Sequence, residues 1–277
     1  MIPTYFLCSL LPAFREAAET RRRGFTLRDY WTFFYLGFFG VCVNQICFTT
    51  GLRYTSVSHS AVIVGLGPIY TLVLAVLLKQ EALSWRKATG MAVSLAGIAL
   101  MASQTGVMSR GPSLLGDAIT MTGSVGFAMY VVLGKGVAGK YDSLTMTTFN
   151  HFAGAIMVLP LAIRGVRTLS RDGAWHSIPW SGWAAVAYMA IFSSALAYVL
   201  YFWLLRYLEA SQLAAFTYVL PVMATVLGII WLGEKGSWPQ LAGGVVALGG
   251  VYWIEAGRAS KADSRDQQTP RGLHRES

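Results

Sequence analysis

The sequence predicts an all-α protein, a polytopic transmembrane helical bundle of two inverted repeats with about eight or nine helices. Three observations predict this fold. Hydrophobic residues make up 55% of the 277 residues and charged residues only 13%, against roughly 25% charged residues in an average soluble domain. The apolar residues fall in long blocks, each close to the ~20 residues that cross the ~30 Å hydrocarbon layer. A sequence unit also occurs twice, at an offset of 153 residues.

Eight apolar blocks are long enough to predict membrane helices. We expect these helices near 31–50, 60–78, 86–103, 114–133, 144–163, 183–205, 211–232 and 238–256. A ninth apolar segment, Ile2 to Phe14, is shorter because Arg15 and Glu16 follow it, and it has the character of the end of a helix whose beginning is missing. A signal peptide is the alternative, but there the basic residues precede the apolar run. The polar segment 258–277 predicts a disordered tail.

The basic residues give the net charge of +9, and they are unevenly distributed. If consecutive spans alternate in direction, 16 of the 22 Lys and Arg residues lie on one side of the membrane. The positive-inside rule then places this side and the C-terminus in the cytoplasm, as in a bacterial inner-membrane protein. Arg164, Arg167 and Arg171 depart from this pattern because they gather on the opposite side. The basicity therefore indicates orientation, and we expect no nucleic-acid partner.

The internal repeat aligns residues 51–102 with 204–255 without a gap, and 15 of the 52 aligned positions are identical. The identical pairs include Pro68 and Pro221, Glu81 and Glu234, and Trp85 and Trp238. The second unit has five predicted helices, and because five is odd, two successive units enter the membrane from opposite sides. Proteins of this architecture bind their solutes at the interface between the repeats.

The spacing that recurs in both units carries a resemblance to a known family. Gly51-Leu52-Arg53-Tyr54 followed by Pro68 and Glu81, and Leu205-Arg206-Tyr207 followed by Pro221 and Glu234, resemble the EamA family of the drug/metabolite transporter superfamily. The resemblance implies ten helices in two units, and a secondary transporter that exports amino-acid-like metabolites or drugs without a cofactor. It divides the chain into a first repeat at 1–103 that lacks about one and a half helices, a second repeat at 114–257, and the tail.

Two prolines lie in the middle of apolar blocks at equivalent positions of the repeats. Pro68 and Pro221 each remove one backbone donor, which frees the carbonyls of Val64 and Thr217. We expect a bend at each proline. A hinge in the solute path is one interpretation, favoured by the symmetric placement, and an ordinary kink is the other.

Other repeated features have structural and functional interpretations. Glu81 and Glu234 end their helices beside tryptophans, which prefer the headgroup level, so a structural role is favoured over proton coupling. Small residues spaced i, i+4, i+7 form a flat stripe on one helix of each repeat. These are Gly90, Ser94 and Gly97, and Gly243, Ala247 and Gly250. Intramolecular helix packing is the default for such stripes, and a homodimer seam is the alternative.

Neutral polar residues inside the spans are the candidates for solute binding. Gln45 aligns with Tyr198 across the repeat, and Tyr201 follows one turn later. We expect these three, with Asn44 and Tyr218, to contact a small-molecule solute in a central cavity, because buried amides and phenols hydrogen-bond polar groups. Tyr130, Asn150 and His151 are further polar residues within spans. Neutral groups favour a zwitterionic or uncharged solute over a phosphate ester.

Catalysis finds no support in the sequence. HExxH, GxSxG and phosphate-loop motifs are absent, and Cys8, Cys42 and Cys47 have no metal-ligand spacing. We therefore expect a transporter in a lipid bilayer, without enzymatic activity, metal or cofactor, which works by rocking its two halves. The alternative is a non-transporting scaffold or an inactive fragment of such a transporter.

Overall fold

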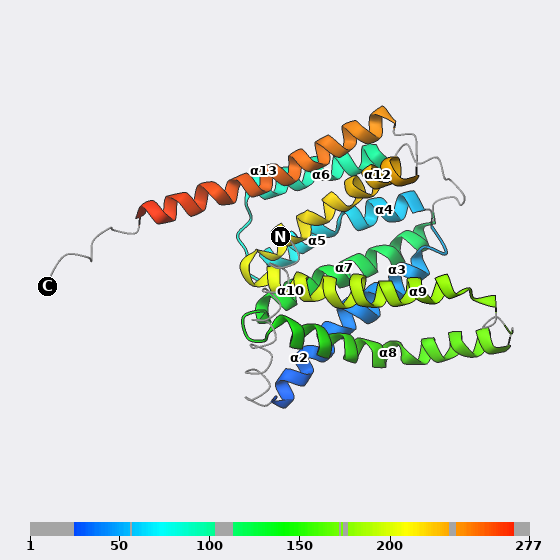
Figure 1. Ribbon diagram of the computed structural model, residues 1–277. Helices are drawn as coiled ribbons and strands as arrows, with labels where there is room; N and C mark the ends of the chain where they lie inside the picture. Colours follow the sequence, from blue (N-terminus) through cyan, green and yellow to red (C-terminus); the bar gives the residue numbers. More distant parts are fainter. Residues whose placement is uncertain are drawn as a thin grey trace, which may run out of the picture.

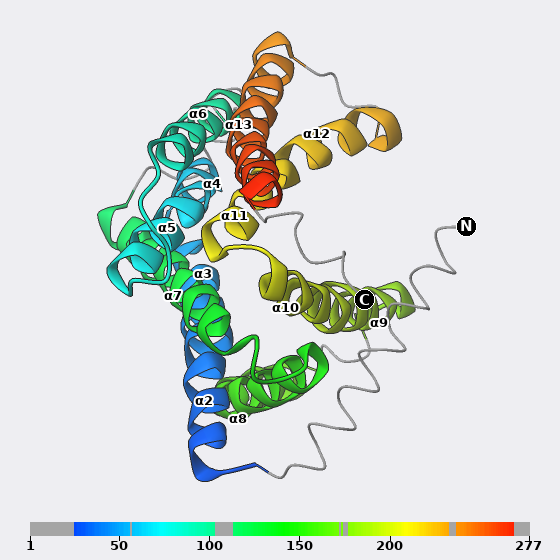
Figure 2. The ribbon, with the colours of Figure 1, turned by 90° about the vertical axis from the view of Figure 1, so that its left-hand side faces the viewer.

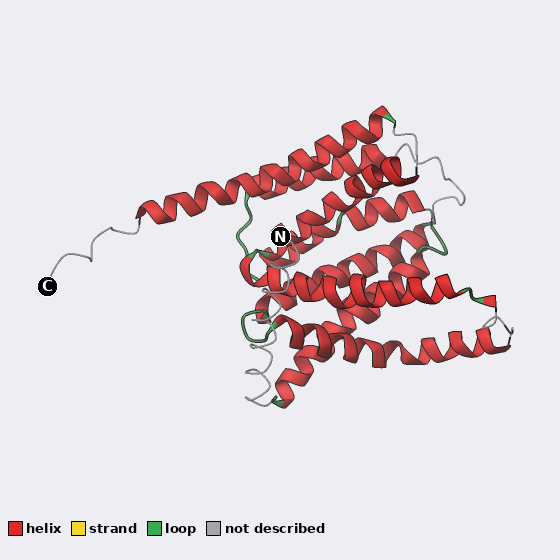
Figure 3. Cartoon of the chain, viewed as in Figure 1, coloured by secondary structure: helices red, strands yellow, loops and turns green. Residues whose placement is uncertain are grey.

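A computed structural model of the chain describes residues 25–55, 57–102, 113–171, 173, 177–232 and 237–268. The elements in this part of the chain are all helical (Figures 1 and 3). In order they are α2 (Leu27–Gly37), η1 (Phe38–Val43), α3 (Asn44–Gly51), α4 (Val57–Gly65), α5 (Gly67–Leu77), α6 (Trp85–Ala102), α7 (Leu114–Val137), α8 (Ser143–Arg171), α9 (Trp180–Tyr188), η3 (Met189–Leu196), α10 (Ala197–Tyr207), α11 (Ala210–Ala215), η4 (Phe216–Tyr218), α12 (Val219–Leu232) and α13 (Trp238–Gln268). Each of the eight predicted membrane helices corresponds to one of these elements or to a continuous series of them.

Within the described residues, five continuous helical stretches are long and apolar enough to cross a membrane. They are Leu27–Gly51, Leu114–Val137, Ser143–Arg171, Trp180–Tyr207 and Ala210–Leu227, and the stretch Val62–Leu77 is a shorter apolar helix. The helices run roughly side by side across the bundle in Figure 1, and Figure 2 shows the same bundle from the end that is on the left in Figure 1. The predicted polytopic all-α fold is therefore confirmed, whereas the expected segment Ile2 to Phe14 lies outside the described residues.

The two stripes of small residues pack against each other and define the relation between the repeats. A Cβ atom at Gly97 would lie 2.5 Å from the carbonyl oxygen of Gly243, and one at Gly90 would lie 2.9 Å from that of Gly250. Because the partner number falls as the residue number rises, α6 and α13 are antiparallel (Figure 1). Equivalent helices of the two repeats thus run in opposite directions, as an inverted repeat requires. The stripes form an intramolecular seam.

Two helices change to a π-helical form at equivalent positions of the repeat. These segments are η1, Phe38–Val43, and η3, Met189–Leu196, and adding the offset of 153 to η1 places it within η3. π-Helical turns are uncommon and occur often at functional sites. Sequence patterning did not predict them.

The two proline helices are also interrupted at equivalent places. Pro68 stands in the first turn of α5, after a break at Leu66, and Pro221 follows the short 3₁₀ segment η4. Proline fits the first helical turn, where its missing N–H group costs little. The expected bend thus takes the form of a break between two shorter helices in each repeat.

The last helix reaches into the segment 258–277 that we expected to be a disordered tail, of which residues 269–277 lie outside the described part of the chain. Helix α13 continues to Gln268 and leaves the bundle (Figure 1). The segment from Arg258 to Gln268 lacks Gly and Pro and contains Ala, Arg, Lys and Gln, which favour helix. An existing helix therefore extends into it without a new nucleation step.

Burial is uneven along the bundle. The connections α5–α6, α7–α8 and α10–α11 lie together at one end, on the left in Figure 1, which we call the charged end. The buried residues of α8 all fall in its first half, from Ser143 to Gly154, which begins at this end. Helix α9 and η3, toward the opposite end, have no residue buried by the described part of the chain. Toward the opposite end, α9, η3 and the second half of α8 are therefore less buried, although other helices pack closely there, as Gly116 does against Thr55 and Gly97 against Gly243.

Candidate functional site

Side chains from three helices of the second repeat form a neutral polar and aromatic cluster. Tyr130 of α7, Asn150 and His151 of α8, and Tyr198 and Tyr201 of α10 compose it, and we call it the tyrosine cluster. The Asn150 side-chain amide donates to the Tyr130 hydroxyl at 3.3 Å, and its oxygen lies 2.7 Å from Nδ1 of His151. The ring of Tyr198 lies edge-on to Tyr130 and to His151, with centroids 6.0 Å and 4.7 Å apart. The ring centroids of Tyr201 and Tyr198 are 6.5 Å apart.

The first repeat supports this cluster through its π-helical segment. Gly40 of η1 packs directly on the Tyr130 ring, and a Cβ atom added there would lie 2.4 Å from the ring. Gly37, at the end of α2, meets the backbone oxygen of Asn150 in the same way. Because these glycines have no side chain, α2 and η1 approach α7 and α8 closely. The tyrosine cluster therefore lies where the two repeats meet.

One hydroxyl in the cluster has no hydrogen-bond partner. The Tyr201 hydroxyl oxygen is buried and forms no hydrogen bond within the described part of the chain, although the ring packs near Phe127 and Tyr198. A buried hydroxyl without a partner costs ~1–3 kcal/mol. A bound solute that forms a hydrogen bond with this hydroxyl would remove most of this free-energy cost. The cluster as a whole offers neutral donors and acceptors set among aromatic rings.

The structure brings together two of the five residues that we predicted to bind solute. Tyr198 and Tyr201 belong to the tyrosine cluster, whereas no hydrogen bond or ring contact among the described residues links Asn44, Gln45 or Tyr218 to it. Gln45 is exposed and Asn44 half-buried at the start of α3. Tyr218 is buried in a second core, around α6 and α13, and its hydroxyl also has no partner in the described structure.

Three cluster residues were not among the predicted solute contacts. Tyr130, Asn150 and His151 were visible in the sequence as polar residues inside apolar blocks. Their relation to Tyr198 depends on how α7, α8 and α10 pack, which the repeat offset does not reveal.

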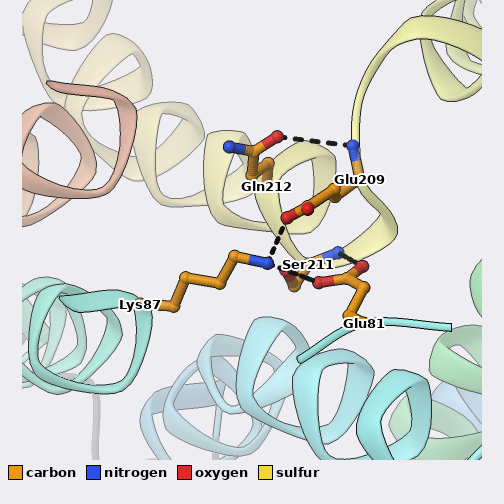
Figure 4. Close-up of polar contacts among 5 residues, drawn as sticks. All are labelled: Glu81, Lys87, Glu209, Ser211 and Gln212. Atoms are coloured by element: carbon orange, nitrogen blue, oxygen red, sulfur yellow. Dashed lines mark hydrogen bonds and ion pairs between the residues drawn. The ribbon is translucent and has the colours of Figure 1, made fainter. Parts of the chain in front are cut away.

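A second polar group connects the repeats at the charged end (Figure 4). Glu81 lies in the α5–α6 connection, and its carboxylate accepts bonds from Lys87 Nζ at 2.7 Å and from the Ser211 backbone N–H at 3.0 Å. The Ser211 hydroxyl also donates to Glu81. Lys87 forms a second ion pair with Glu209, whose backbone N–H donates to Gln212. We call these five residues the Glu81 network.

Burial distinguishes the two carboxylates of this network. The Glu81 side chain is 3% exposed and that of Lys87 12%, whereas that of Glu209 is 49% exposed. An ion pair in water contributes ~0–1 kcal/mol, but a buried charge that loses its partner is strongly destabilising. Glu81 is therefore the residue on which this contact between the repeats depends.

A further ion pair ties α2 to the α7–α8 connection at the same end. One carboxylate oxygen of Asp29 pairs with Lys140 at 2.5 Å and accepts a hydrogen bond from the Tyr141 hydroxyl. The other oxygen accepts the backbone N–H bond of Thr26 at 2.8 Å. The hydrogen bond to Asp29 raises the pKa of the Lys140 ammonium, which is consistent with a lasting ion pair. These two polar links join segments more than one hundred residues apart at the charged end.

These features define the class of protein: an α-helical membrane protein of two inverted repeats, with a neutral polar cluster where they meet. The chain belongs to the EamA-like transporter family, whose model matches residues 2–103 and 114–256.

Two relatives illustrate the family. An uncharacterized transporter of Archaeoglobus fulgidus is 26% identical over 227 residues, which cover 82% of this chain and 78% of the relative. A probable terminal-alkyne amino-acid exporter of Streptantibioticus cattleyicolor is 23% identical over 231 residues, which cover 83% of this chain and 74% of that protein. A solved crystal structure matches the fold with a TM-score of 0.70 at 17% identity, over 84% of this chain and 78% of that one.

Proposed function

We propose that the chain is a secondary transporter that exports a neutral or zwitterionic, amino-acid-like solute by alternating access, and that the tyrosine cluster binds the solute. The observation that carries this proposal is the buried Tyr201 hydroxyl without a partner, beside Tyr198 and at the meeting point of the repeats. Gln45, Asn44 and Tyr218 remain candidate contacts on other helices. The transport class itself follows from family membership.

The chemistry of the cluster selects the solute class. Phenol and amide groups can hydrogen-bond a carboxylate, an ammonium or a neutral amide, and the rings favour an apolar part. A multiply charged solute would need an opposing charge, because burying an uncompensated charge is expensive. One relative is named as a probable terminal-alkyne amino-acid exporter, and this supports the same class.

The Glu81 network supports a state that is closed at the charged end. Its buried carboxylate joins the α5–α6 connection to α11, while α9 and η3, toward the opposite end, have no residue buried by the described part of the chain. In an alternating-access cycle, the solute would leave beside α9 and η3, and the network would separate when the charged end opens.

The moving parts are the interrupted helices rather than whole repeats. Each repeat packs extensively on the other, through α6 with α13 and α3 with α7, so rocking two rigid halves would disrupt these interfaces. Breaks at Leu66 and η4, and the π-helical segments, divide four spans into shorter helices. Pro68 and Pro221 would then act as hinges at two of these breaks.

The distribution of charge supports a cytoplasmic location for the charged end. The connections and helix ends located there include Lys79, Lys87, Lys140 and Arg206, and α13 carries further basic residues beyond the bundle. The positive-inside rule then puts the C-terminus in the cytoplasm of a bacterial inner membrane. With α9 and η3 at the outward-facing end, release of the solute beside them is export.

Ligand-induced stabilisation tests this function directly. Purified protein is heated with a panel of neutral amino acids and amino-acid-like drugs, and with phosphate esters as the contrasting class. We expect at least one neutral solute to raise the melting temperature, with a smaller rise in Tyr201→Phe but not in Tyr188→Phe, whose ring is exposed on α9. Stabilisation by phosphate esters alone, or equal stabilisation of both variants, would contradict the proposal.

A further inference from the structure

A groove lies on the outer surface between α6 and α13, away from the tyrosine cluster. Its volume is about 760 Å³, and its lining includes Trp85, Arg86, Thr89, Val93, Gly249 and Trp253. Ligand pockets have volumes of ~300–1,000 Å³. The groove owes part of its depth to Gly249, where an added Cβ atom would meet no atom within 4 Å.

One basic residue is held in a fixed orientation inside this groove. The Arg86 Nε–H donates to the backbone oxygen of Trp253 at 3.0 Å, and the guanidinium carbon lies 4.7 Å from the centre of the Trp253 ring. These contacts use one of five guanidinium N–H groups. Within the described part of the chain the Nη nitrogens form no hydrogen bond or ion pair, so they are available to an anion.

The groove lies at the depth where lipid phosphates are found. Trp85 and Trp253 are 83% and 52% exposed on the outer surface, and tryptophan side chains of membrane proteins concentrate at the headgroup level. Trp85 begins α6 at the charged end, and Val93 and Gly249 line the groove farther along the helices. An occupant would therefore meet a cation at the interface and an apolar channel toward the hydrocarbon.

We propose that this groove binds one anionic phospholipid, with the phosphate at Arg86 and an acyl chain along Val93 and Gly249. The match between the cation and a lipid phosphate, and the apolar remainder of the groove, favour a lipid over a soluble anion. The small-residue seam of α6 and α13 is already occupied within the chain, which disfavours a second copy of the protein as the occupant. This inference does not depend on the transported solute.

Lipid titration of the detergent-purified full chain tests this site. Native mass spectrometry counts bound phosphatidylglycerol, and the melting temperature is measured with phosphatidylglycerol, phosphatidylcholine or inorganic phosphate. We expect Arg86→Gln to weaken phosphatidylglycerol binding about fivefold, the effect of ~1 kcal/mol for one basic residue at an anionic surface. Arg86→Lys should retain part of this binding. Arg28→Gln is the control. It removes the same charge, but from an exposed residue in the first turn of α2.

Filling the groove provides the second arm. Gly249→Leu should reduce binding of both lipids, since the new side chain enters the space of the acyl chain. Equal phosphatidylglycerol binding by Arg86→Gln and the parent would overturn the proposal. A rise in melting temperature with inorganic phosphate but not with phosphatidylglycerol would also overturn it, because it would indicate a site for a soluble anion. Conversion of a dimer to a monomer by Gly249→Leu, measured by light scattering, would overturn it in favour of an interface between copies.

Discussion

Replacing Glu81 with Gln should open the charged end of the protein. Gln keeps the size of the side chain and an oxygen that can accept the Ser211 N–H bond, but it removes the negative charge that pairs with Lys87. Because Glu81 is 3% exposed, water does not replace the lost interaction. Lys87 keeps Glu209 as a partner, which limits the cost.

The magnitude follows from these contacts. A hydrogen bond to a charged group contributes ~1.5–3 kcal/mol, and the remaining partner of Lys87 lowers this to ~1–3 kcal/mol. If the network exists only when the charged end is closed, the equilibrium shifts toward the open form about 5- to 150-fold. Glu209→Gln removes the same charge from a side chain that is 49% exposed, so its effect is ~0–1 kcal/mol, or about fivefold at most.

Cysteine accessibility measures this shift. In a background in which Cys8, Cys42 and Cys47 are replaced by Ala, Tyr198→Cys reports access to the tyrosine cluster. A membrane-impermeant maleimide is applied from the charged end in oriented vesicles. We expect Glu81→Gln to accelerate labelling much more than Glu209→Gln. An unchanged labelling rate in Glu81→Gln, or equal rates in the two variants, would refute the role assigned to the buried carboxylate.

Further predictions concern the cluster, the seam and a helix cap. Tyr201→Phe should leave the melting temperature unchanged or raise it, because it removes a buried hydroxyl without a partner, while weakening solute binding by ~1–3 kcal/mol. Gly97→Val should destabilise the protein by ~1–3 kcal/mol or more, since its Cβ meets backbone atoms at 2.5 Å, whereas Gly165→Ala, with open space around it, should not. Asp142→Ala should cost ~1 kcal/mol, because Asp142 accepts the Thr145 N–H bond at the start of α8. Thermal unfolding in detergent checks the stability changes, and a dissociation constant checks the binding.

The sequence predicted the helices well because their physical cause is local. Apolar blocks of membrane-spanning length need only composition to be recognised, and the offset of 153 residues predicted the equivalence of α6 and α13. The offset alone did not identify the partner of each stripe: intramolecular packing was the default interpretation, and a homodimer seam was the alternative. The contacts of Gly97 and Gly243 settle the partner of this seam.

The π-helical segments and the composition of the cluster depend on tertiary packing. Gly40 leaves room for the Tyr130 ring, and only the position of α7 reveals that the two meet. The repeat offset placed Gln45 opposite Tyr198 in sequence, but equivalent positions of inverted repeats face different neighbours. Gln45 is exposed, whereas Tyr198 packs on His151. The internal symmetry therefore identified Tyr198 but not the residues that surround it.

Solute counterflow in proteoliposomes tests the central claim most directly. Vesicles that contain the full chain are preloaded with the neutral amino-acid-like solute that stabilises the purified protein, and entry of the labelled solute is followed. We predict exchange by the parent and by Tyr188→Phe, and a strong reduction in Tyr201→Phe, without any requirement for nucleotide. Exchange that is equal in all three proteins would contradict the assignment of the tyrosine cluster, and a folded parent that exchanges no solute of this class would contradict the proposed function.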